Sequence, residues 1–505
     1  MTLDQTSNPK LRLLRNDAQR TILDSLASHG WTAKITRESY PGEYLIIEAE
    51  RGEARRRLAF FYSSATDNRH YQVAAQDADI IFHNGEPYKL ESFAYGIQVP
   101  VRPVKTFYAT LLEWNQAFDP ARADSGSAGP LPARPSRVRH LTAEDPLAAI
   151  WTRLDQLQSV RLARKVVTRR CADAGIQLEG QILDAKAEGV AFCVRNAADY
   201  FRGPQTNLGS RVLALYYGIL SFACAEMLAD PVGRAGLSEV EAATKRGHGL
   251  YTVPADDDDL GELGVGVSNA GFYPAWVRLL TPDVGAFPKT RATTAAELVA
   301  LPAEFRTTLR DLLAAVPELG DLYAEVFDGP PAWITPVYDM EANGAAAGQW
   351  LHGSGASYIH LLDTSGRIDW NMAPLSAWPF AEPMPIKRSD ERSALRVRVD
   401  HPGYESWHEA LPLHRSAFLG STSLIFPGLV GAGRYRVLAF ATAYALSIVV
   451  RYLPSTWRRV DGGDWDHYRA LIAEAVTVFA RVLPEEFLEA IAGDRVVARM
   501  PGAFM

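Results

Sequence analysis

Two long uncharged apolar stretches constrain the fold of this chain more than any other feature. They run from Val212 to Ala225 and from Val437 to Val450. Each is shorter than the roughly 20 residues that a bilayer-crossing helix needs. Because both are apolar nearly all round, each is typical of a helix that is buried on every side. We therefore expect these two helices to pack against each other at the centre of one helical domain.

Composition narrows the class of protein further. The chain has 505 residues, 47% of them hydrophobic and 22% charged, which excludes a disordered or collagen-like protein and favours two or three domains. A net charge of -7 argues against a basic surface over the whole protein, although it leaves room for a local basic patch. The three cysteines, Cys171, Cys193 and Cys224, are too few and too far apart for a disulfide scaffold or a four-cysteine zinc site. The polar N-terminus lacks a signal-peptide pattern, so we expect a cytoplasmic protein.

The spacing of apolar residues and turn residues predicts an α+β fold in two parts. Residues 1–118 are expected to form a small α/β domain, and residues 119–146, with five prolines, a linker. Residues 147–505 are expected to form a large, mainly helical domain that contains a short mixed β insertion between 330 and 398.

The N-terminal domain is expected to place one helix before a mainly antiparallel sheet. The helix covers Leu11–His29, where apolar residues recur at helical spacing before Gly30. Short segments rich in β-branched and aromatic residues predict four strands: Trp31–Arg37, Tyr44–Glu50, Arg57–Ser63 and Tyr71–Phe82. This order of elements is compatible with a degenerate restriction-endonuclease-like fold.

Two carboxylates of this domain are candidate catalytic residues. Strand periodicity puts Glu48 and Glu50 on one face, where their oxygens could hold Mg²⁺ as in restriction-type nucleases. Those nucleases carry a Lys two residues after the second acid, and this chain has Gly52 there. The alternative is that both glutamates belong to the polar face of a half-exposed strand.

Four arginines beside these carboxylates are candidate nucleic-acid contacts. Arg51, Arg55, Arg56 and Arg57 form the densest basic cluster in the chain, and arginines in a row at a hairpin suit contacts with phosphates. A charged hairpin edge that prevents aggregation explains the same residues equally well.

Several motifs of the helical part resemble one known family. The C-terminal motif is Ala445–Trp457, and the earlier motifs are Ala187–Phe192, Ala197–Phe201, Leu213–Leu220 and Gly247–Leu250. Over roughly residues 150 to 495 these motifs resemble the bacterial YaaC-like protein family. That family carries no assigned reaction to transfer, so the resemblance implies a fold and points to motif residues: Tyr216, Tyr217, His248, Arg451, Tyr452 and Trp457.

The aromatic pairs on consecutive helices also resemble the helical HEPN class, whose members often cleave RNA or act in defence against foreign nucleic acid. Its ribonucleases need an Arg followed after four to six residues by a His at a helix end. Arg396 and His401 have this spacing, so they are candidate catalytic residues. Apolar alternation around them predicts a strand, which is the wrong local structure for that motif.

Arg451 has two interpretations from its position. It follows a buried helix, so its guanidinium is expected at the helix C-terminus, where a cation complements the dipole and bonds orphan carbonyls. Contact with a ligand is the alternative.

Three functional hypotheses follow from these residues. The first is a nucleic-acid-associated component, in defence or housekeeping, that binds through the basic face of the N-terminal domain. The second is a nuclease that uses Glu48 and Glu50 with Mg²⁺, and the third is a non-catalytic subunit of a larger complex. We expect no cofactor apart from Mg²⁺ in the second case and no metal otherwise. The expected partners are nucleic acid, other protein subunits or a second copy of the chain, and no membrane.

Overall fold

The fold is described from a computed structural model. The structure describes residues 9–501 except 29, 40–42, 53, 85–92, 108–109, 112–113, 115–136, 233–235, 255–258, 283, 340–354, 388–392, 402–403 and 405. Its chain forms two compact units. The first comprises Met1–Pro130, Val337–Leu361 and Leu375–Trp407, and the second comprises Leu131–Pro336, Leu362–Pro374 and His408–Met505.

The first unit begins with the predicted helix, which is confirmed. It runs without a break through α1 (Pro9–Ala18), the π-helical turn η2 (Gln19–Leu23) and α2 (Asp24–Ser28). One face of this helix is buried through residues at helical spacing: Leu11, Leu14, Ala18, Ile22 and Leu26. Gly30 follows with a φ of 75°, the left-handed conformation that ends helices.

The helix covers one face of a five-stranded sheet with the order β1–β2–β3–β4–β5. The strands are β1 (Thr32–Glu38), β2 (Tyr44–Arg51), β3 (Ala54–Phe61), β4 (Ile80–His83) and β5 (Val101–Pro103). The first three strands pair antiparallel, whereas β4 and β5 pair parallel, so the sheet is mixed rather than mainly antiparallel.

The predicted strand Tyr71–Phe82 is wrong in its first half. These residues form the end of α3 (Asn68–Ala74), and only the last part belongs to β4. Asp67 caps α3 by accepting a hydrogen bond from the Arg69 amide, and the Tyr71 ring stacks on Phe61 beneath it. The aromatic side chains that favoured a strand are thus the buried face of a short helix on the second side of the sheet.

Three further strands of the first unit and two of the second come from the middle of the sequence. In the first unit β12 (Phe380–Lys387) pairs antiparallel with β13 (Ser393–Asp400), and β11 (Ala356–Leu362) is next to β13. In the second unit β10 (Trp333–Tyr338) pairs antiparallel with β14 (Leu424–Ile425). The strands expected between residues 330 and 398 are therefore present, but β11, β12 and β13 belong to the first unit and not to the mainly helical one.

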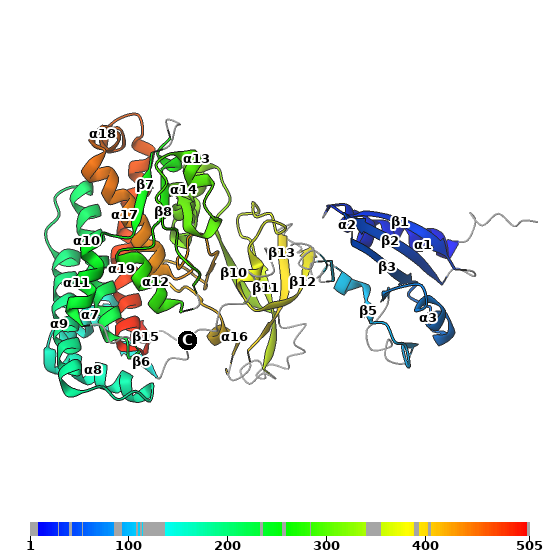
Figure 1. The fold of residues 1–505 in the computed structure, drawn as a ribbon, viewed down its shortest axis with the longest axis horizontal. Coiled ribbons are helices and arrows are strands. Elements are labelled where there is room, and N and C mark those ends of the chain that lie inside the picture. The colour runs from blue at the N-terminus through cyan, green and yellow to red at the C-terminus, as the bar shows by residue number, and fades with distance from the viewer. Residues whose placement is uncertain are drawn as a thin grey trace, which may run out of the picture. The chain divides into compact units, whose positions relative to one another are not determined.

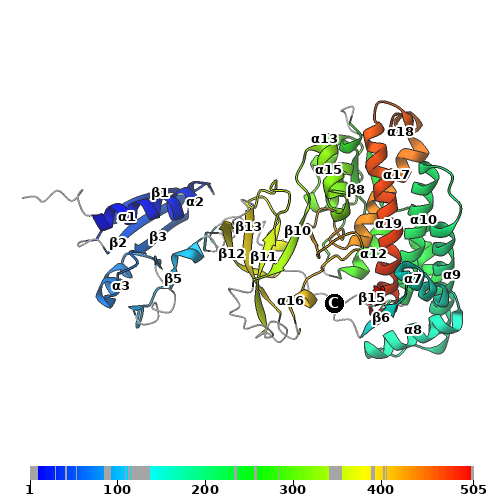
Figure 2. The ribbon, with the colours of Figure 1, turned by 180° about the vertical axis from the view of Figure 1, so that it is seen from behind.

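The second unit is mainly helical, which confirms the α+β class (Figure 1). Its longest helices are α9 (Gly180–Arg202), α10 (Leu208–Ala229), α17 (Tyr435–Tyr452) and α19 (Asp466–Ala492). Seen from either side, these four helices run next to one another (Figures 1 and 2). The other helices are α7 (Pro146–Leu157), α8 (Val160–Asp173), α11 (Leu237–Lys245), α12 (Phe272–Leu280), α13 (Ala295–Val299), α14 (Leu309–Ala314), α15 (Gly320–Phe327), α16 (Trp407–Ala410) and α18 (Pro454–Gly462).

Two small sheets complete this unit. One has the antiparallel order β7 (Leu250–Val253), β8 (Gly264–Val267) and β9 (Arg306–Thr308). The other pairs β6 (Val138–Thr142) parallel with β15 (Arg495–Arg499). Strand β6 therefore occupies part of the predicted linker 119–146, and the residues 119–136 lie outside the described residues. The domain boundaries at 118 and 147 stay a prediction.

The two apolar helices meet in the core, as predicted. The Tyr216 ring of α10 lies 5.6 Å from Phe440 and 5.9 Å from Tyr444 of α17, centroid to centroid. Helix α10 is long and apolar enough to cross a membrane, but most of it is buried among the other helices, as in core helices of soluble proteins. The cytoplasmic location itself stays a prediction.

A buried network of charges crosses this apolar core. Arg436 of α17 donates to both carboxylate oxygens of Glu226 on α10, at 2.5 and 2.9 Å, and the Trp276 indole donates to the same carboxylate at 3.0 Å. Nearby, His414 Nε2 lies 2.7 Å from a carboxylate oxygen of Glu318, and its ring stacks on Tyr435 at 3.8 Å.

The His414 pair makes the stability of this unit depend on pH. Burial alone would lower the pKa of His414, but the hydrogen bond to Glu318 and the charges of Glu318 and Glu486 outweigh burial and raise the pKa to about 9. A raised histidine pKa stabilises the fold fully below the unfolded value of about 6.5, and this contribution is lost as pH rises toward 9.

We therefore expect the free energy of unfolding to fall by on the order of 3 kcal/mol between pH 6.5 and pH 9. Urea unfolding followed by tryptophan fluorescence measures it. The H414Q variant should have a lower free energy of unfolding at pH 6.5 and should lack this part of the pH dependence. A wild-type stability that stays constant or rises over the same range would contradict the assignment.

Candidate functional site

Four of the predicted motif residues meet in one bonded cluster. Tyr216 and Tyr217 belong to α10, His248 lies in the turn between α11 and β7, and Arg451 lies in the last turn of α17. The Tyr216 hydroxyl is 2.6 Å from His248 Nδ1, and Arg451 Nη1 donates to the Tyr217 hydroxyl at 3.3 Å. We call these four residues the Tyr–His–Arg cluster.

Glycines hold the turn that presents His248. Gly247 and Gly249 have φ values of 97° and 81°, which side chains rarely adopt. A Cβ on Gly271 would lie 2.5 Å from the Gly249 amide nitrogen, so the two segments approach as closely as only glycine allows. The Tyr273 amide at the start of α12 donates to the His248 carbonyl at 2.9 Å. The backbone of the turn is therefore fixed on both sides of the histidine.

The bond to Tyr216 sets the protonation of His248. Tyr216 is fully buried, and burial raises the pKa of its phenol, which therefore stays protonated. A buried phenol must donate its hydrogen, and His248 Nδ1 is the acceptor that the described residues offer. Burial, and then the charge of Arg451, lower the pKa of His248. At neutral pH the ring is thus uncharged with its proton on Nε2, a donor.

Arg451 lies in the last turn of α17, as expected, and its contact with a ligand stays a prediction. Its Nε donates to the Ser447 carbonyl and its Nη2 to the Ser447 hydroxyl, both at 3.1 Å, so the side chain folds back on its own helix. The Ser447 carbonyl lies one turn before the four orphan carbonyls of α17, so the expected bond to an orphan carbonyl is not the one that forms. No carboxylate contacts its guanidinium among the residues that the structure describes. A half-buried guanidinium without a counter-charge is a candidate contact for an anion.

A second cation, Arg291, was missed by the sequence analysis. A Cβ on Gly247 would lie 4.0 Å from Arg291 Nη2, so this exposed guanidinium lies beside the His248 turn. The charges of Arg291 and Arg451 both oppose the effect of burial, which raises the pKa of Tyr444. Both cations are therefore close to Tyr444 of α17. Nothing in the local sequence marks Arg291 as a site residue, because only the fold places it beside the His248 turn.

Two exposed tyrosines lie next to the cluster. Tyr200 of α9 is 41% exposed and stacks on Tyr217 with ring centroids 5.6 Å apart. Tyr452 is 64% exposed, and the Arg451 guanidinium lies 5.0 Å from its ring centroid. Trp457, the remaining motif residue, is on α18, and its Nε1 lies 3.5 Å from the place of a Cβ on Gly209, at the start of α10.

The basic residues of the N-terminal hairpin are largely paired with acids. Strand register sets Glu48 opposite Arg57 and Glu50 opposite Arg55. Arg55 contacts Glu48 at 3.0 Å and Glu50 at 3.1 Å, and Arg57 contacts Glu48 at 2.9 Å. These cross-strand pairs explain the residues as a charged hairpin edge. Nucleic-acid binding through Arg51, Arg55, Arg56 and Arg57 stays a prediction.

The same ion pairs engage Glu48 and Glu50, the two carboxylates predicted as ligands of Mg²⁺. Burial raises the pKa of Glu48, but the hydrogen bonds and charges of Arg55 and Arg57 outweigh it and lower the pKa. Mg²⁺ at Glu48 and Glu50 would have to displace both guanidinium groups. Within the described part of the chain, no three His, Cys, Asp or Glu side chains are grouped as metal ligands.

The structure does not bring Arg396 and His401 into a common site. Arg396 of β13 approaches Asp339 at 3.6 Å. His401 is fully buried after β13, and its Nε2 lies 2.9 Å from the Ser357 hydroxyl. Arg396 lies within the strand that the alternation predicted and His401 comes directly after it, so neither is at a helix end. Their role in catalysis stays a prediction.

The electrostatics of the cluster predict a low pKa for His248. We expect its ring to titrate below the ordinary value of about 6.5, and the R451Q variant to raise the midpoint because it removes a nearby positive charge. NMR titration of ¹⁵N-labelled histidines measures both midpoints. The exposed Arg161 of α8 supplies the control variant R161Q, which should leave the midpoint unchanged. A midpoint above 6.5 in the wild type would contradict the described environment.

A comparison with protein families matches this chain to one family model. The model is described as YaaC-like Protein, and it matches residues 155–491, which include all four residues of the Tyr–His–Arg cluster. No curated protein and no solved structure matches the chain. The similarity to the HEPN class stays a prediction.

Proposed function

The chain belongs to the YaaC-like family, and on that premise we propose that its helical unit binds a single strand of nucleic acid at the Tyr–His–Arg cluster. The observation that carries this proposal is the convergence of unpaired cations and exposed aromatic rings. It retains the expected nucleic-acid partner but assigns the contact to the helical unit instead of the N-terminal hairpin.

The polar groups of the cluster select an anion. His248 offers an N–H donor at Nε2, and Arg451 and Arg291 offer positive charge. Neither arginine forms an ion pair with a described residue. A phosphate group supplies both the charge and the acceptor oxygens that such a set of donors needs. A protein of net charge -7 binds a polyanion only through a local concentration of cations of this kind.

The exposed tyrosines favour a nucleic acid over a bare phosphate. Tyr200 stacks on the cluster residue Tyr217 from the neighbouring helix α9, and Tyr452 directly follows Arg451 in α17. Stacking of a base on an aromatic side chain contributes about 1 to 3 kcal/mol per base and tolerates any sequence. Bases of a single strand can reach such rings, whereas those of a duplex stay stacked within it. The proposed ligand is therefore single-stranded.

The geometry supports binding rather than cleavage. The Tyr216 phenol stays protonated, so it is a poor nucleophile. Its hydroxyl lies at hydrogen-bond distance from His248 Nδ1, so that nitrogen is not free to act as a base. A general base would need a free ring nitrogen without a proton, and the remaining nitrogen of His248 carries one. We also propose a role in defence, which would require that the bound strand comes from foreign nucleic acid.

We expect labelled single-stranded RNA or DNA to bind the full chain in fluorescence anisotropy, with an affinity that falls as salt rises. The R451Q variant should bind at least about tenfold more weakly, because it loses a charge-assisted phosphate contact. The logarithmic salt slope should become shallower by about 0.7 for each phosphate contact that is lost.

The control variants separate the two candidate surfaces. R161Q should bind like the wild type. If the triple change R55E, R56E and R57E abolishes binding while R451Q has no effect, the hairpin is the binding surface and this proposal is wrong. A wild type that binds no strand at low salt would also contradict it, and the complex-subunit hypothesis would replace it.

A further inference from the structure

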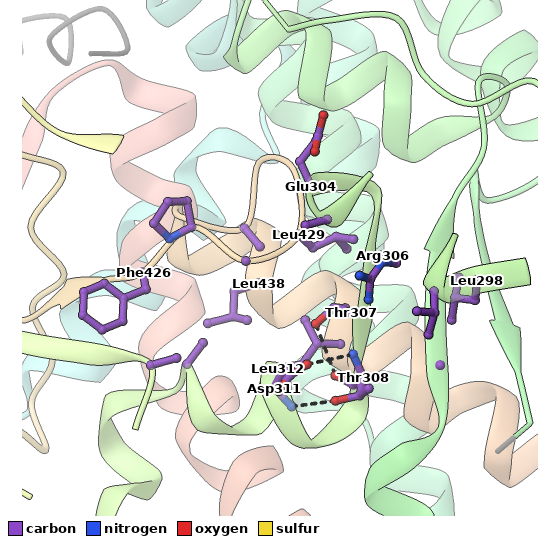
Figure 3. A pocket seen from close by; sticks show the side chains of 18 of the residues that line it. Leu298, Glu304, Arg306, Thr307, Thr308, Asp311, Leu312, Phe426, Leu429 and Leu438 are labelled. Carbon is purple, nitrogen blue, oxygen red and sulfur yellow. Dashed lines mark hydrogen bonds between the residues drawn. The ribbon is translucent and has the colours of Figure 1, made fainter. Parts of the chain in front are cut away.

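The second unit contains a cavity that the proposed function does not use. Its volume is about 730 Å³, within the range of small-molecule sites. It lies between the sheet β7–β8–β9, the helices α13 and α14, and the segment from Phe426 to Ala432 before α17 (Figure 3). All the residues that line it belong to this one compact unit.

The walls of the cavity are mainly apolar. Leu298, Leu312, Leu429 and Leu438 contribute side chains from α13, α14, the segment before α17 and α17 itself. Phe426 adds an aromatic ring at one end (Figure 3). Contact with these walls favours a hydrocarbon or aromatic body, because its transfer from water stabilises the complex in proportion to the apolar area buried.

One cation lies among these apolar groups. Arg306, at the start of β9, is half-buried, and its Nε donates to the Leu301 carbonyl at 3.0 Å, which fixes the guanidinium plane. The two remaining nitrogens have no hydrogen bond or ion pair with any described residue. Figure 3 shows them directed toward Thr307 and Leu438, on the cavity side.

The acids near Arg306 are engaged elsewhere or point away. Asp311 accepts from the Thr308 amide at 3.3 Å as part of a capping box, and Glu262 pairs with Arg310 at 3.0 Å. Glu304 is exposed, and its carboxylate points away from Arg306 in Figure 3. Glu262, Glu304 and Asp311 thus share the lining with Arg306, but none of them forms an ion pair with it.

We propose that this cavity binds a small apolar acid, with its hydrocarbon or aromatic body against the leucines and its carboxylate on Arg306. A single guanidinium beside an apolar wall matches a ligand with one anionic end. A nucleotide would place a polar sugar and several charges against the leucine side chains, which is unfavourable. This inference does not depend on the function proposed for the Tyr–His–Arg cluster.

Three ligands with the same chain and different head groups test the charge preference. Isothermal titration calorimetry of the full chain would compare decanoate, decanol and decylammonium below their micelle concentrations. Decanoate should bind most tightly, decanol about tenfold more weakly, and decylammonium most weakly, because only the carboxylate pairs with Arg306. Equal affinity for all three, or no binding of decanoate at millimolar concentration, would overturn the proposal.

Two variants locate the binding. R306Q should weaken decanoate about tenfold and leave decanol unchanged, whereas R458Q, at an exposed arginine of α18, should change neither affinity. A432L narrows the cavity and should weaken both ligands. If A432L does not fold, as judged by its thermal transition, R306Q alone decides. Unchanged decanoate affinity in R306Q would overturn the assignment.

Discussion

The buried ion pair between Arg436 and Glu226 is the interaction on which the helical unit depends. Arg436 lies near the start of α17 and Glu226 near the end of α10, and the bidentate contact joins the two helices deep in the core. Removing one partner of such a pair typically costs about 3 to 5 kcal/mol, because the other charge is left buried and unpaired. The pair therefore disfavours any alignment of α10 and α17 that separates Arg436 from Glu226.

That alignment positions the candidate site farther along the same helices, near the middle of α10 and in the last turn of α17. A Cβ on Gly209 would lie 3.4 Å from Val450, Tyr216 contacts Tyr444 and Glu226 contacts Arg436, so rising numbers on α10 meet falling numbers on α17. The helices are antiparallel, and the register fixed by the ion pair determines that Arg451 reaches Tyr217. The glycine-fixed turn of His248 adds the third component, which neither helix supplies.

The sequence predicted those parts of the structure that depend on local chemistry. An uninterrupted apolar run has few ways to fold in water, so α10 and α17 and their contact were predicted correctly. Residues Tyr71 to Ala74 were assigned to the wrong element because aromatic and β-branched side chains suit the buried face of a short helix as well as a strand. The pairing of Glu48 with Arg57 depends on strand register, which hairpin composition alone does not determine.

The candidate site was predictable only in part. Its motif residues stood out through their resemblance to a family, but their convergence required the fold. Arg291 had no local signal, and neither did the lack of carboxylate partners for Arg291 and Arg451 among the described residues. The position of Arg291 and the lack of carboxylate partners both depend on side chains that are far apart in the sequence. These two observations distinguish a candidate anion site from a helix cap at Arg451. The apolar cavity beside Arg306 likewise depends on residues from separate segments between Val253 and Leu438.

Photo-crosslinking tests the central claim most directly, because it reports where a strand lies as well as whether it binds. The full chain would be irradiated with single-stranded RNA that carries 4-thiouridine, and the crosslinked peptides would be identified by mass spectrometry. We expect crosslinks in the peptides that contain Tyr200 and Tyr452, the exposed rings beside the cluster. Crosslinks confined to the hairpin around Arg55, or none under conditions where the strand binds, would contradict it.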